Sequence, residues 1–590
     1  MPLALPAALS TTGDPAAAAL FGGNILAPRA AMTGDGSYAE AVAALNVTGL
    51  RYPGGSLTEY YFSLTEPDAA TAIHAVTGAE TAFIPLSEFM TYAGASGHAV
   101  TIVLPTRDQL SEVRDETGNR LPQIDEEDLR DFLHDLVTGV YGEAEIAALE
   151  IGNEYWGSGE MTAVEYGRLA AQMAEVIADE LALVAEVQGI DTSEIRVLAQ
   201  MGQNYGASKM SEDYSGWTAE EIIADLAQTY PRAGLSSANI RGNGEVNWSE
   251  VTNALLRMGF ETEAQQDALD GIIAHVYARG SEASRSYDLD VIRNSWLEQE
   301  GLGHLEVHVT EWNLKSSEAL DAEHDYGLLQ AQEMLEIVEE FLAAGVDQAH
   351  VWPLIQNTPN ALATGFSYEG STVPGAMFSL MAEAIPGKTL LDFTPAQDAT
   401  TEAQAGDIDV HGFAGQGELL LYLTAQGSAA SHAELDLSGL VSGFGSMEIT
   451  LLGVADGAAA GDSAAIPQLQ RLDPQEVYRE GVLEVSFGPH EILQVVLRDV
   501  LPSEAFAPLF EVLGTADAGA DPDADPGADA GADPEAGAAG LETILPVLAP
   551  APPPPDAEDG ADDGDSEGGS GWAEVGMLLA LLPLVGLLGL

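Results

Sequence analysis

The chain of 590 residues contains no cysteine. Disulfide bonds, thiolate nucleophiles and cysteine-ligated metal centres are therefore excluded. Basic residues are also scarce, since 20 Lys and Arg stand against 94 Asp and Glu, which gives a formal net charge of −74. Because phosphate binding requires a basic surface, this balance excludes a nucleic-acid partner. Such a charge suits a protein that must stay soluble in salt, where screening shortens the reach of self-repulsion.

Both ends of the chain are unusual in composition. The first twenty residues lack a basic start and a continuous apolar run, so a classical signal peptide is not expected. Residues 513–571 are mainly Ala, Asp, Gly and Pro and predict a disordered acidic linker. Residues 572–590 end in an uncharged apolar run, shorter than the ~20 residues that span a membrane. We expect a sorting, secretion or anchor segment, and hence a secreted or cell-surface protein; membrane contact through this tail stays open.

The first two thirds of the chain alternate short apolar runs with helical patterns, which is typical of βα units around a parallel sheet. Eight such runs are present, the number that closes a (β/α)8 barrel. We predict a catalytic barrel over residues 1–386. The expected strands are Phe21–Leu26, Gly49–Tyr52, Val100–Leu104, Ala147–Ile151, Arg196–Ala199, Ile272–Tyr277, Glu306–Thr310 and Ala349–Pro353.

Helical spacing fades after about residue 386, and short β-rich runs separated by turn residues follow. This pattern predicts an all-β sandwich over residues 387–512. The expected strands are Ile408–Phe413, Leu419–Thr424, Ala433–Leu437, Met447–Leu452, Val482–Phe487 and Ile492–Leu497.

Two glutamates end apolar runs of the predicted barrel. Glu154 follows the fourth run and Glu311 ends the seventh, and these strands lie on opposite sides of an eight-stranded ring. Glycosidic bond hydrolysis needs two carboxyl groups that face each other across the sugar. Barrel enzymes carry their active site at the C-terminal ends of the strands. A single glutamate at a strand end often only pairs with an arginine, but two at these places, with aromatic neighbours, favour catalysis.

Three stretches carry a resemblance to a known group of enzymes. They are Leu50–Gly55 (LRYPGG), Glu150–Glu154 (EIGNE) and Thr310–Asn313 (TEWN). With the downstream sandwich, the chain over about residues 20–500 resembles the clan A glycoside hydrolases, and most of all the α-L-arabinofuranosidase family. The resemblance implies that Glu154 is the acid/base and Glu311 the nucleophile of a retaining mechanism. The chain departs from the family pattern in its short region before the barrel and in Ser56–Phe62, which leaves the substrate open.

Five further residues are candidates for substrate binding or positioning. Asn153 could bind a sugar hydroxyl or only form a turn, and Arg51 could keep the nucleophile ionised or form a structural ion pair. His275 and Tyr277 lie on the same face of their strand, so both point inward or neither does. Trp352 could form an apolar floor under a sugar or pack against the sandwich.

No cofactor or metal is expected, because His304 and His308 lie near or on a strand and share no helical face. The leading hypothesis is a retaining glycoside hydrolase that cleaves a plant- or algal-type poly- or oligosaccharide. Neutral arabinose-, xylose- or glucose-type glycans are favoured, because the negative field disfavours anionic ones. Two alternatives stay open: a catalytically silent carbohydrate-binding protein on a barrel scaffold, and a structural exoprotein in which the linker and tail matter most.

Overall fold

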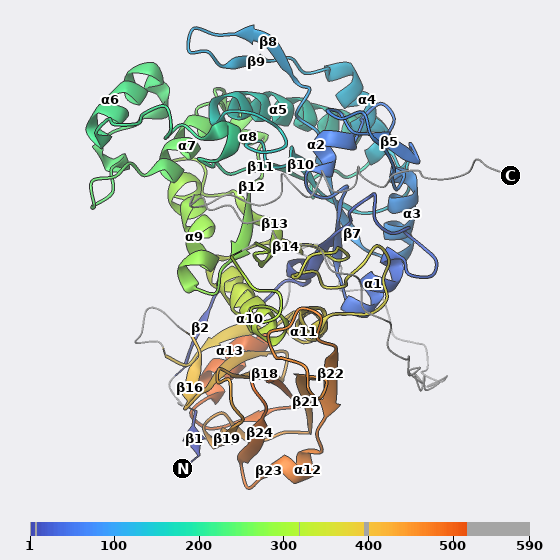
Figure 1. Cartoon of the computed structure of the whole chain (residues 1–590), viewed down its shortest axis with the longest axis vertical. Coiled ribbons are helices and arrows are strands. Elements are labelled where there is room, and N and C mark those ends of the chain that lie inside the picture. Colours follow the sequence, from blue (N-terminus) through green and yellow to red (C-terminus); the bar gives the residue numbers. More distant parts are fainter. Residues whose placement is uncertain (1, 6–8, 318, 395–400, 516–590) are drawn as a thin grey trace, which may run out of the picture. The chain divides into compact units, whose positions relative to one another are not determined.

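The computed structural model describes residues 2–5, 9–317, 319–394 and 401–515 (Figure 1). The tail at 572–590 and the linker from residue 516 onward lie outside the described residues. The last described helix, α13 (Ala507–Thr515), packs Phe510 into an apolar core beside Phe506, which precedes the helix, and it continues past the predicted linker start at residue 513. Within the described part of the chain, no helix combines the length and the apolar character needed to cross a membrane.

Eight parallel strands close into a barrel, which confirms the predicted fold class. All eight predicted strands are present, with ends shifted by a few residues. Two strands lie between β10 and β13, so the strands that carry the two candidate glutamates are three places apart in the ring. In chain order the strands are β3 (Gly22–Asn24), β4 (Gly49–Tyr52), β7 (Ala99–Leu104), β10 (Ile146–Ile151), β11 (Arg196–Gln200), β12 (Gly271–Ala278), β13 (Glu306–Leu314) and β14 (Gln348–Val351).

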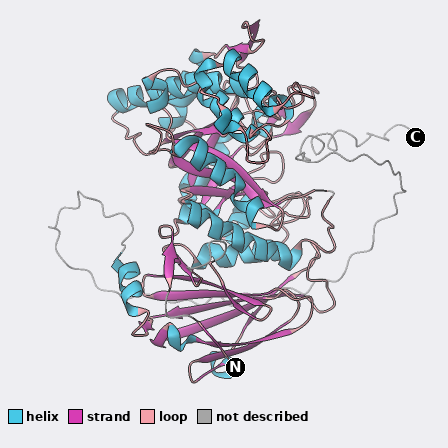
Figure 2. Cartoon of the chain, turned by 90° about the vertical axis from the view of Figure 1, so that its left-hand side faces the viewer, coloured by secondary structure: helices cyan, strands magenta, loops and turns pink. Residues whose placement is uncertain are grey.

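Helices surround the barrel strands (Figure 2). The longest, α5, begins at a capping box in which Thr162 and Glu165 satisfy each other's backbone N–H groups, and it ends at Gly189 in the left-handed conformation. The main helices are α1 (Tyr38–Leu45), α3 (Leu86–Ser96), α4 (Glu126–Val137), α5 (Ala163–Gln188), α6 (Ala219–Thr229), α7 (Trp248–Arg257), α9 (Glu282–Ile292), α10 (Gly327–Ala344) and α11 (Val373–Ala384).

Two sheets with a shared apolar core form the region after the barrel, as expected. All six predicted strands are present. The smaller sheet has the order β1-β19-β24-β23 and the larger one β2-β15-β17-β18-β25-β21-β22. Their strands are β1 (Leu3–Ala4), β2 (Ser10–Thr12), β15 (Thr389–Asp392), β17 (Ile408–Gly415), β18 (Glu418–Ala425), β19 (Ser431–Asp436), β21 (Ser446–Val454), β22 (Pro467–Arg471), β23 (Tyr478–Arg479), β24 (Val482–Phe487) and β25 (Ile492–Arg498).

The start of the chain belongs to these sheets and not to the barrel. β1 pairs with β19 and β2 pairs with β15, so the expected barrel limits of residues 1–386 are wrong at the N-terminal end. Strands of two and three residues carry too little periodic pattern to be recognised from the sequence. Their partners are distant in the chain, since Leu3 pairs with Leu435 and Thr12 with Leu390.

Helices α10 and α11 of the barrel contact the larger sheet directly. The side-chain amide of Gln332 donates to the carbonyl oxygens of Ala425 and His490, and that of Gln494 donates to Leu380 O. The sandwich is therefore fixed to the last two barrel helices, on the chain segments that flank β14.

Candidate active site

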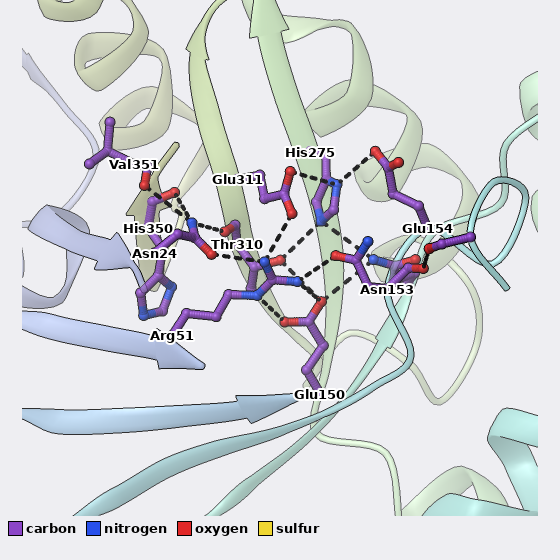
Figure 3. A network of polar contacts seen from close by, with 12 residues as sticks. Asn24, Arg51, Glu150, Asn153, Glu154, His275, Thr310, Glu311, His350 and Val351 are labelled. Carbon is purple, nitrogen blue, oxygen red and sulfur yellow. Dashed lines mark hydrogen bonds and ion pairs between the residues drawn. The ribbon is translucent and has the colours of Figure 1, made fainter. Parts of the chain in front are cut away.

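Glu154 and Glu311 meet at the C-terminal ends of the barrel strands (Figure 3). Glu311 lies on β13, and Glu154 lies three residues beyond the end of β10. A carboxylate oxygen of each lies within 4.8 Å of the other. The side chain of Glu311 is 5% exposed and that of Glu154 is 14% exposed, so both remain within reach of a bound molecule. The structure thus brings together the two glutamates that the sequence singled out.

The loop that carries Glu154 has an unusual backbone. Glu154 has a φ of 44°, in the left-handed region that non-glycine residues rarely adopt. Gly152 has a φ of 74°, and a Cβ atom there would lie 2.7 Å from Thr106 Oγ1. The ring of Tyr155 stacks on Tyr166 of α5, with centroids 4.3 Å apart. Strained backbone that packing holds in place is common at functional sites, because it directs a side chain where it is needed.

Arg51, at the end of β4, is fully buried and connects β10 with β13 through Glu150 and Glu311. Its guanidinium forms a two-pronged ion pair with Glu150, with both distances 2.7 Å, and donates to Glu311 Oε1 at 2.9 Å. It also donates to Asn24 Oδ1 at 2.9 Å and Asn153 Oδ1 at 2.8 Å. Burial alone would lower the pKa of Arg51, but the two carboxylates raise it overall. Arg51 therefore holds a permanent positive charge beside Glu311.

Glu311 is held on its other oxygen by Tyr277, whose hydroxyl donates to Oε2 at 2.6 Å. Burial and the nearby Glu311 raise the pKa of Tyr277 well above its ordinary value, so the phenol stays protonated. The adjacent His275 Nδ1 lies 3.3 Å from Glu154 Oε1 and 3.7 Å from Glu311 Oε2. Burial lowers the pKa of His275, but Glu311 and Glu154 offset this and leave it raised. His275 thus links the two carboxylates.

Asn153 is held through both its backbone and its side chain. Its backbone N–H donates to Glu59 Oε1 at 2.9 Å, and its Oδ1 accepts from Arg51. Glu59 also accepts backbone N–H bonds from Thr106 and Arg107, so it joins the loops after β7 and β10. Among the described residues, no hydrogen bond holds the Asn153 Nδ2 group, which leaves it available as a donor to a ligand.

Trp352 lies at the end of β14, against the turn that follows β4. A Cβ atom on Gly55 would lie 2.5 Å from the Trp352 ring, and Gly54 and Gly55 both have positive φ values. The ring is 5% exposed. Glycine is therefore required in the turn because the indole occupies the space that a side chain would fill.

Polar contacts join six of the seven predicted site residues at one centre: the two glutamates, Arg51, Asn153, His275 and Tyr277. The seventh, Trp352, packs against the turn at Gly54 and Gly55. The structure also adds Asn24, Glu59, Glu150 and Gln200; the side-chain amide of Gln200 lies 3.5 Å from Glu150 Oε1 and 3.4 Å from His275 Nε2. The role of Glu150 could have been inferred from the sequence, since a charged residue within the apolar run of a strand needs a buried partner. The role of Glu59 could not, because its segment Ser56–Phe62 has no recognisable spacing.

A metal ion has two geometrically suitable groups of residues in the described part of the chain. One consists of Glu154, His275 and Glu311, and the other of Glu339, Glu402 and His411. In the first group, Arg51 and Tyr277 already occupy both oxygens of Glu311, and a cation there would face the charge of Arg51. This donor set suits an ionised carboxylate more than a metal ligand.

A cavity of about 390 Å³ lies elsewhere, among α7, α8 (Glu263–Asp267) and the helical turn η5 (Arg293–Leu297). Arg257 and Trp296 contribute to its lining. Its acidic residues are Glu261, which pairs with Arg232, and Glu300. Neither of the paired carboxylates at the barrel mouth contributes to this cavity, so the candidate active site is the barrel mouth.

Solved structures share this architecture. A family 51 α-L-arabinofuranosidase from Bifidobacterium longum matches with a TM-score of 0.53 and 14% identity, covering 84% of this chain and 99% of that one. A second arabinofuranosidase matches with a TM-score of 0.50, 14% identity and the same coverage. The chain has the fold of these glycoside hydrolases. No family model matches its sequence, and no curated protein matches it at a significant level.

Proposed function

We propose that this chain is a retaining glycoside hydrolase in which Glu311 is the nucleophile and Glu154 the acid/base. The observation that carries the proposal is the pair of carboxylates within 4.8 Å at the mouth of the barrel. Retaining enzymes place their carboxyl groups ~5–5.5 Å apart, whereas inverting enzymes leave ~6.5–9.5 Å for a water molecule. The short separation supports retention.

The surroundings of the two carboxylates support different roles for them. Glu311 accepts hydrogen bonds from Arg51 and Tyr277, and both stabilise its negative charge. Glu154 contacts His275 at the longer distance of 3.3 Å and is the more exposed of the two. An ionised, oriented carboxylate suits nucleophilic attack, and an accessible carboxylic acid suits proton transfer.

In the first step, Glu311 attacks the anomeric carbon while Glu154 transfers its proton to the departing glycosidic oxygen. The bond to that oxygen breaks as the ester bond to Glu311 forms. In the second step, Glu154 removes a proton from water, which attacks the anomeric carbon and releases Glu311 as a carboxylate. Two inversions at one carbon give net retention, and Glu154 regains its proton.

Asn153 and Trp352 then take up binding roles in this proposal. The Nδ2 group of Asn153 would donate to a sugar hydroxyl next to the anomeric carbon, a contact that strengthens in the transition state. Trp352 would form one wall beside the sugar. The substrate is a carbohydrate, as the arabinofuranosidase neighbours suggest, but those neighbours do not define the sugar for this chain.

The test is hydrolysis of a panel of nitrophenyl furanosides and pyranosides, and of polysaccharides, by the wild type and by Glu311→Gln. Glu339→Gln is the matched control, because it replaces an equally buried glutamate away from the barrel mouth. We expect cleavage by the wild type and the control, and none by Glu311→Gln. If the folded wild type cleaves none of the substrates in the panel, the alternative of a carbohydrate-binding protein without activity is favoured instead.

A further inference from the structure

Some of the 20 Lys and Arg side chains of this acidic chain form no ion pair with a described carboxylate. Among the described residues, most Lys and Arg side chains form ion pairs with carboxylates. Those that form none are Arg29, Arg241, Arg257, Arg279, Lys315 and Arg479. Three of these, Arg29, Arg279 and Lys315, follow the C-terminal ends of barrel strands, where the candidate active site lies.

Arg279 and Lys315 are neighbours across the two strands that carry most of the catalytic residues. β12 and β13 pair Ala278 with Leu314, and the Lys315 backbone N–H continues the ladder by donating to Ala278 O at 2.9 Å. Each cation therefore lies one position beyond the end of its strand. The strands present these two side chains next to each other at the mouth.

The alternation of side chains directs both cations toward the catalytic face. Arg279 lies two residues after Tyr277, and Lys315 lies four residues after Glu311. Residues at even spacing along a strand share a face. With ~3.3 Å of rise per residue, Arg279 lies about 7 Å and Lys315 about 13 Å along the strand beyond those residues. If the alternation continues one residue past each strand, both side chains lie on the side of the sheet that carries Tyr277 and Glu311.

Placing two like charges together costs free energy unless an anion neutralises them. Burial and then the charge of Arg279 lower the pKa of Lys315, which shows that the two cations act on each other. Burial raises the pKa of Asp288 to about 6, and the charge of Arg279 acts against this shift, so Asp288 offsets part of the Arg279 charge, although it forms no ion pair with either cation. Among the described residues, no carboxylate forms an ion pair with Arg279 or with Lys315.

We propose that Arg279 and Lys315 form an oxyanion subsite, so that the substrate is an anionic glycan carrying uronate carboxylates or sulfate esters. An arginine fork and a lysine ammonium are the usual partners of such planar or tetrahedral oxyanions. This inference rests on the proposed glycoside hydrolase function and reverses the expectation of a neutral glycan. The net negative field does not oppose it, because salt screens that field beyond ~8 Å while the two cations act at contact.

The test measures binding rather than turnover, with the full chain carrying Glu154→Gln. Calorimetric titration would compare uronate, sulfated and neutral oligosaccharides of matched galacto and gluco configuration. We expect at least one anionic series to bind tenfold or more tightly than its neutral counterpart. Whether the carboxylate or the sulfate series binds identifies the source of the anion.

Lys315→Met should weaken anionic binding about tenfold and leave neutral binding within twofold, and Lys315→Arg should restore it. Arg479→Gln is the control, since it removes an unpaired cation from the sandwich and should change neither. Three results would overturn the subsite. The neutral series could bind as tightly as the anionic series or more tightly, Lys315→Met could weaken the binding of both series equally, or no anionic oligosaccharide could bind.

These outcomes separate the subsite from the enzymatic function. Suppose that anionic glycans bind in a way that depends on Lys315, but the wild type cleaves none of the substrates. The proposed subsite would then stand, and the proposed hydrolase function would be rejected. Suppose instead that the wild type cleaves a neutral glycan with retention of configuration, and that Lys315→Met does not change this activity. The hydrolase function would then stand, and the subsite would be rejected.

Discussion

The buried histidines His275 and His411 both lie among carboxylates, in different parts of the molecule. At the barrel mouth, His275 links Glu154 and Glu311. Where α10 meets β17, His411 contacts Glu339, whose two carboxylate oxygens lie 3.0 and 3.1 Å from His411 Nδ1. The residue types are the same, but the two environments differ in how completely the carboxylates are buried and hydrogen-bonded.

The site at α10 and β17 is closed. His411 is 1% exposed, its second nitrogen lies 3.3 Å from Thr424 Oγ1, and burial is offset by Glu339 so that the pKa of His411 is raised to about 10. At the mouth, Glu154 keeps an exposed side and only a longer contact to His275. The buried pair of His411 and Glu339 stabilises the fold. At the barrel mouth, by contrast, the partly exposed Glu154 lies beside the hydrogen-bonded Glu311, an arrangement that can support catalysis.

Replacing the open carboxylate should have the largest effect on activity. Glu154→Gln removes the proposed acid/base and should lower kcat about 10²–10⁴-fold. Because the amide keeps the shape of the side chain, the free energy of unfolding should change little. Steady-state kinetics and urea unfolding measure both. Similar losses of activity in Glu339→Gln would remove the distinction between the two sites.

Removing Arg51 should damage both activity and stability. Arg51→Met leaves Glu150 and Glu311 buried without their cation, and breaking a buried ion pair in this way costs ~3–5 kcal/mol. The comparison is Arg285→Met on α9, where Arg285 is less buried and pairs with Glu333 and Glu336 of α10. Urea unfolding should show the larger loss for Arg51→Met. If that variant does not fold, Arg51→Lys should fold with reduced activity, and full activity in it would contradict the account.

The closed site should make stability depend on pH. Because the folded pKa of His411 is raised to about 10, its contribution is complete below its ordinary value of 6.5 and is lost as pH rises through about 10. Burial raises the pKa of Glu340 to about 7, which acts in the same direction between pH 4.5 and 7. The Tm should fall from pH 6 to 10, and Glu339→Gln should flatten that slope above pH 6.5. An unchanged slope would show that His411 is not the titrating group.

The smallest effect is expected from Tyr277→Phe. It removes one hydrogen bond to Glu311 and keeps the aromatic ring in place. A loss of ~1.4 kcal/mol of transition-state stabilisation would lower kcat/KM about tenfold. The thermal unfolding midpoint serves as the control. A loss as large as that of Glu154→Gln would mean that Tyr277 takes part in proton transfer.

The barrel and much of the sandwich could be predicted because their strands are apolar runs bounded by turns. The two glutamates could be placed because each ends such a run. The short strands β1 and β2 could not be predicted, since partners distant in sequence define them. The same holds for the role of Glu150, whose ion pair with Arg51 spans 99 residues.

The pair Arg279 and Lys315 shows a different limit. Net charge alone led to the expectation of a neutral glycan, because composition averages over the surface. Only the register of β12 and β13 reveals that two unpaired cations are neighbours. Local charge at a binding site is a property of the fold and cannot be obtained from a total.

The most direct test of the central claim is the configuration of the first product. Proton NMR during cleavage of a substrate found in the glycoside panel would follow the anomeric signal before mutarotation. Double displacement by Glu311 and Glu154 predicts that the first sugar released has the configuration of the substrate. Release of the inverted anomer by the wild type would contradict the account.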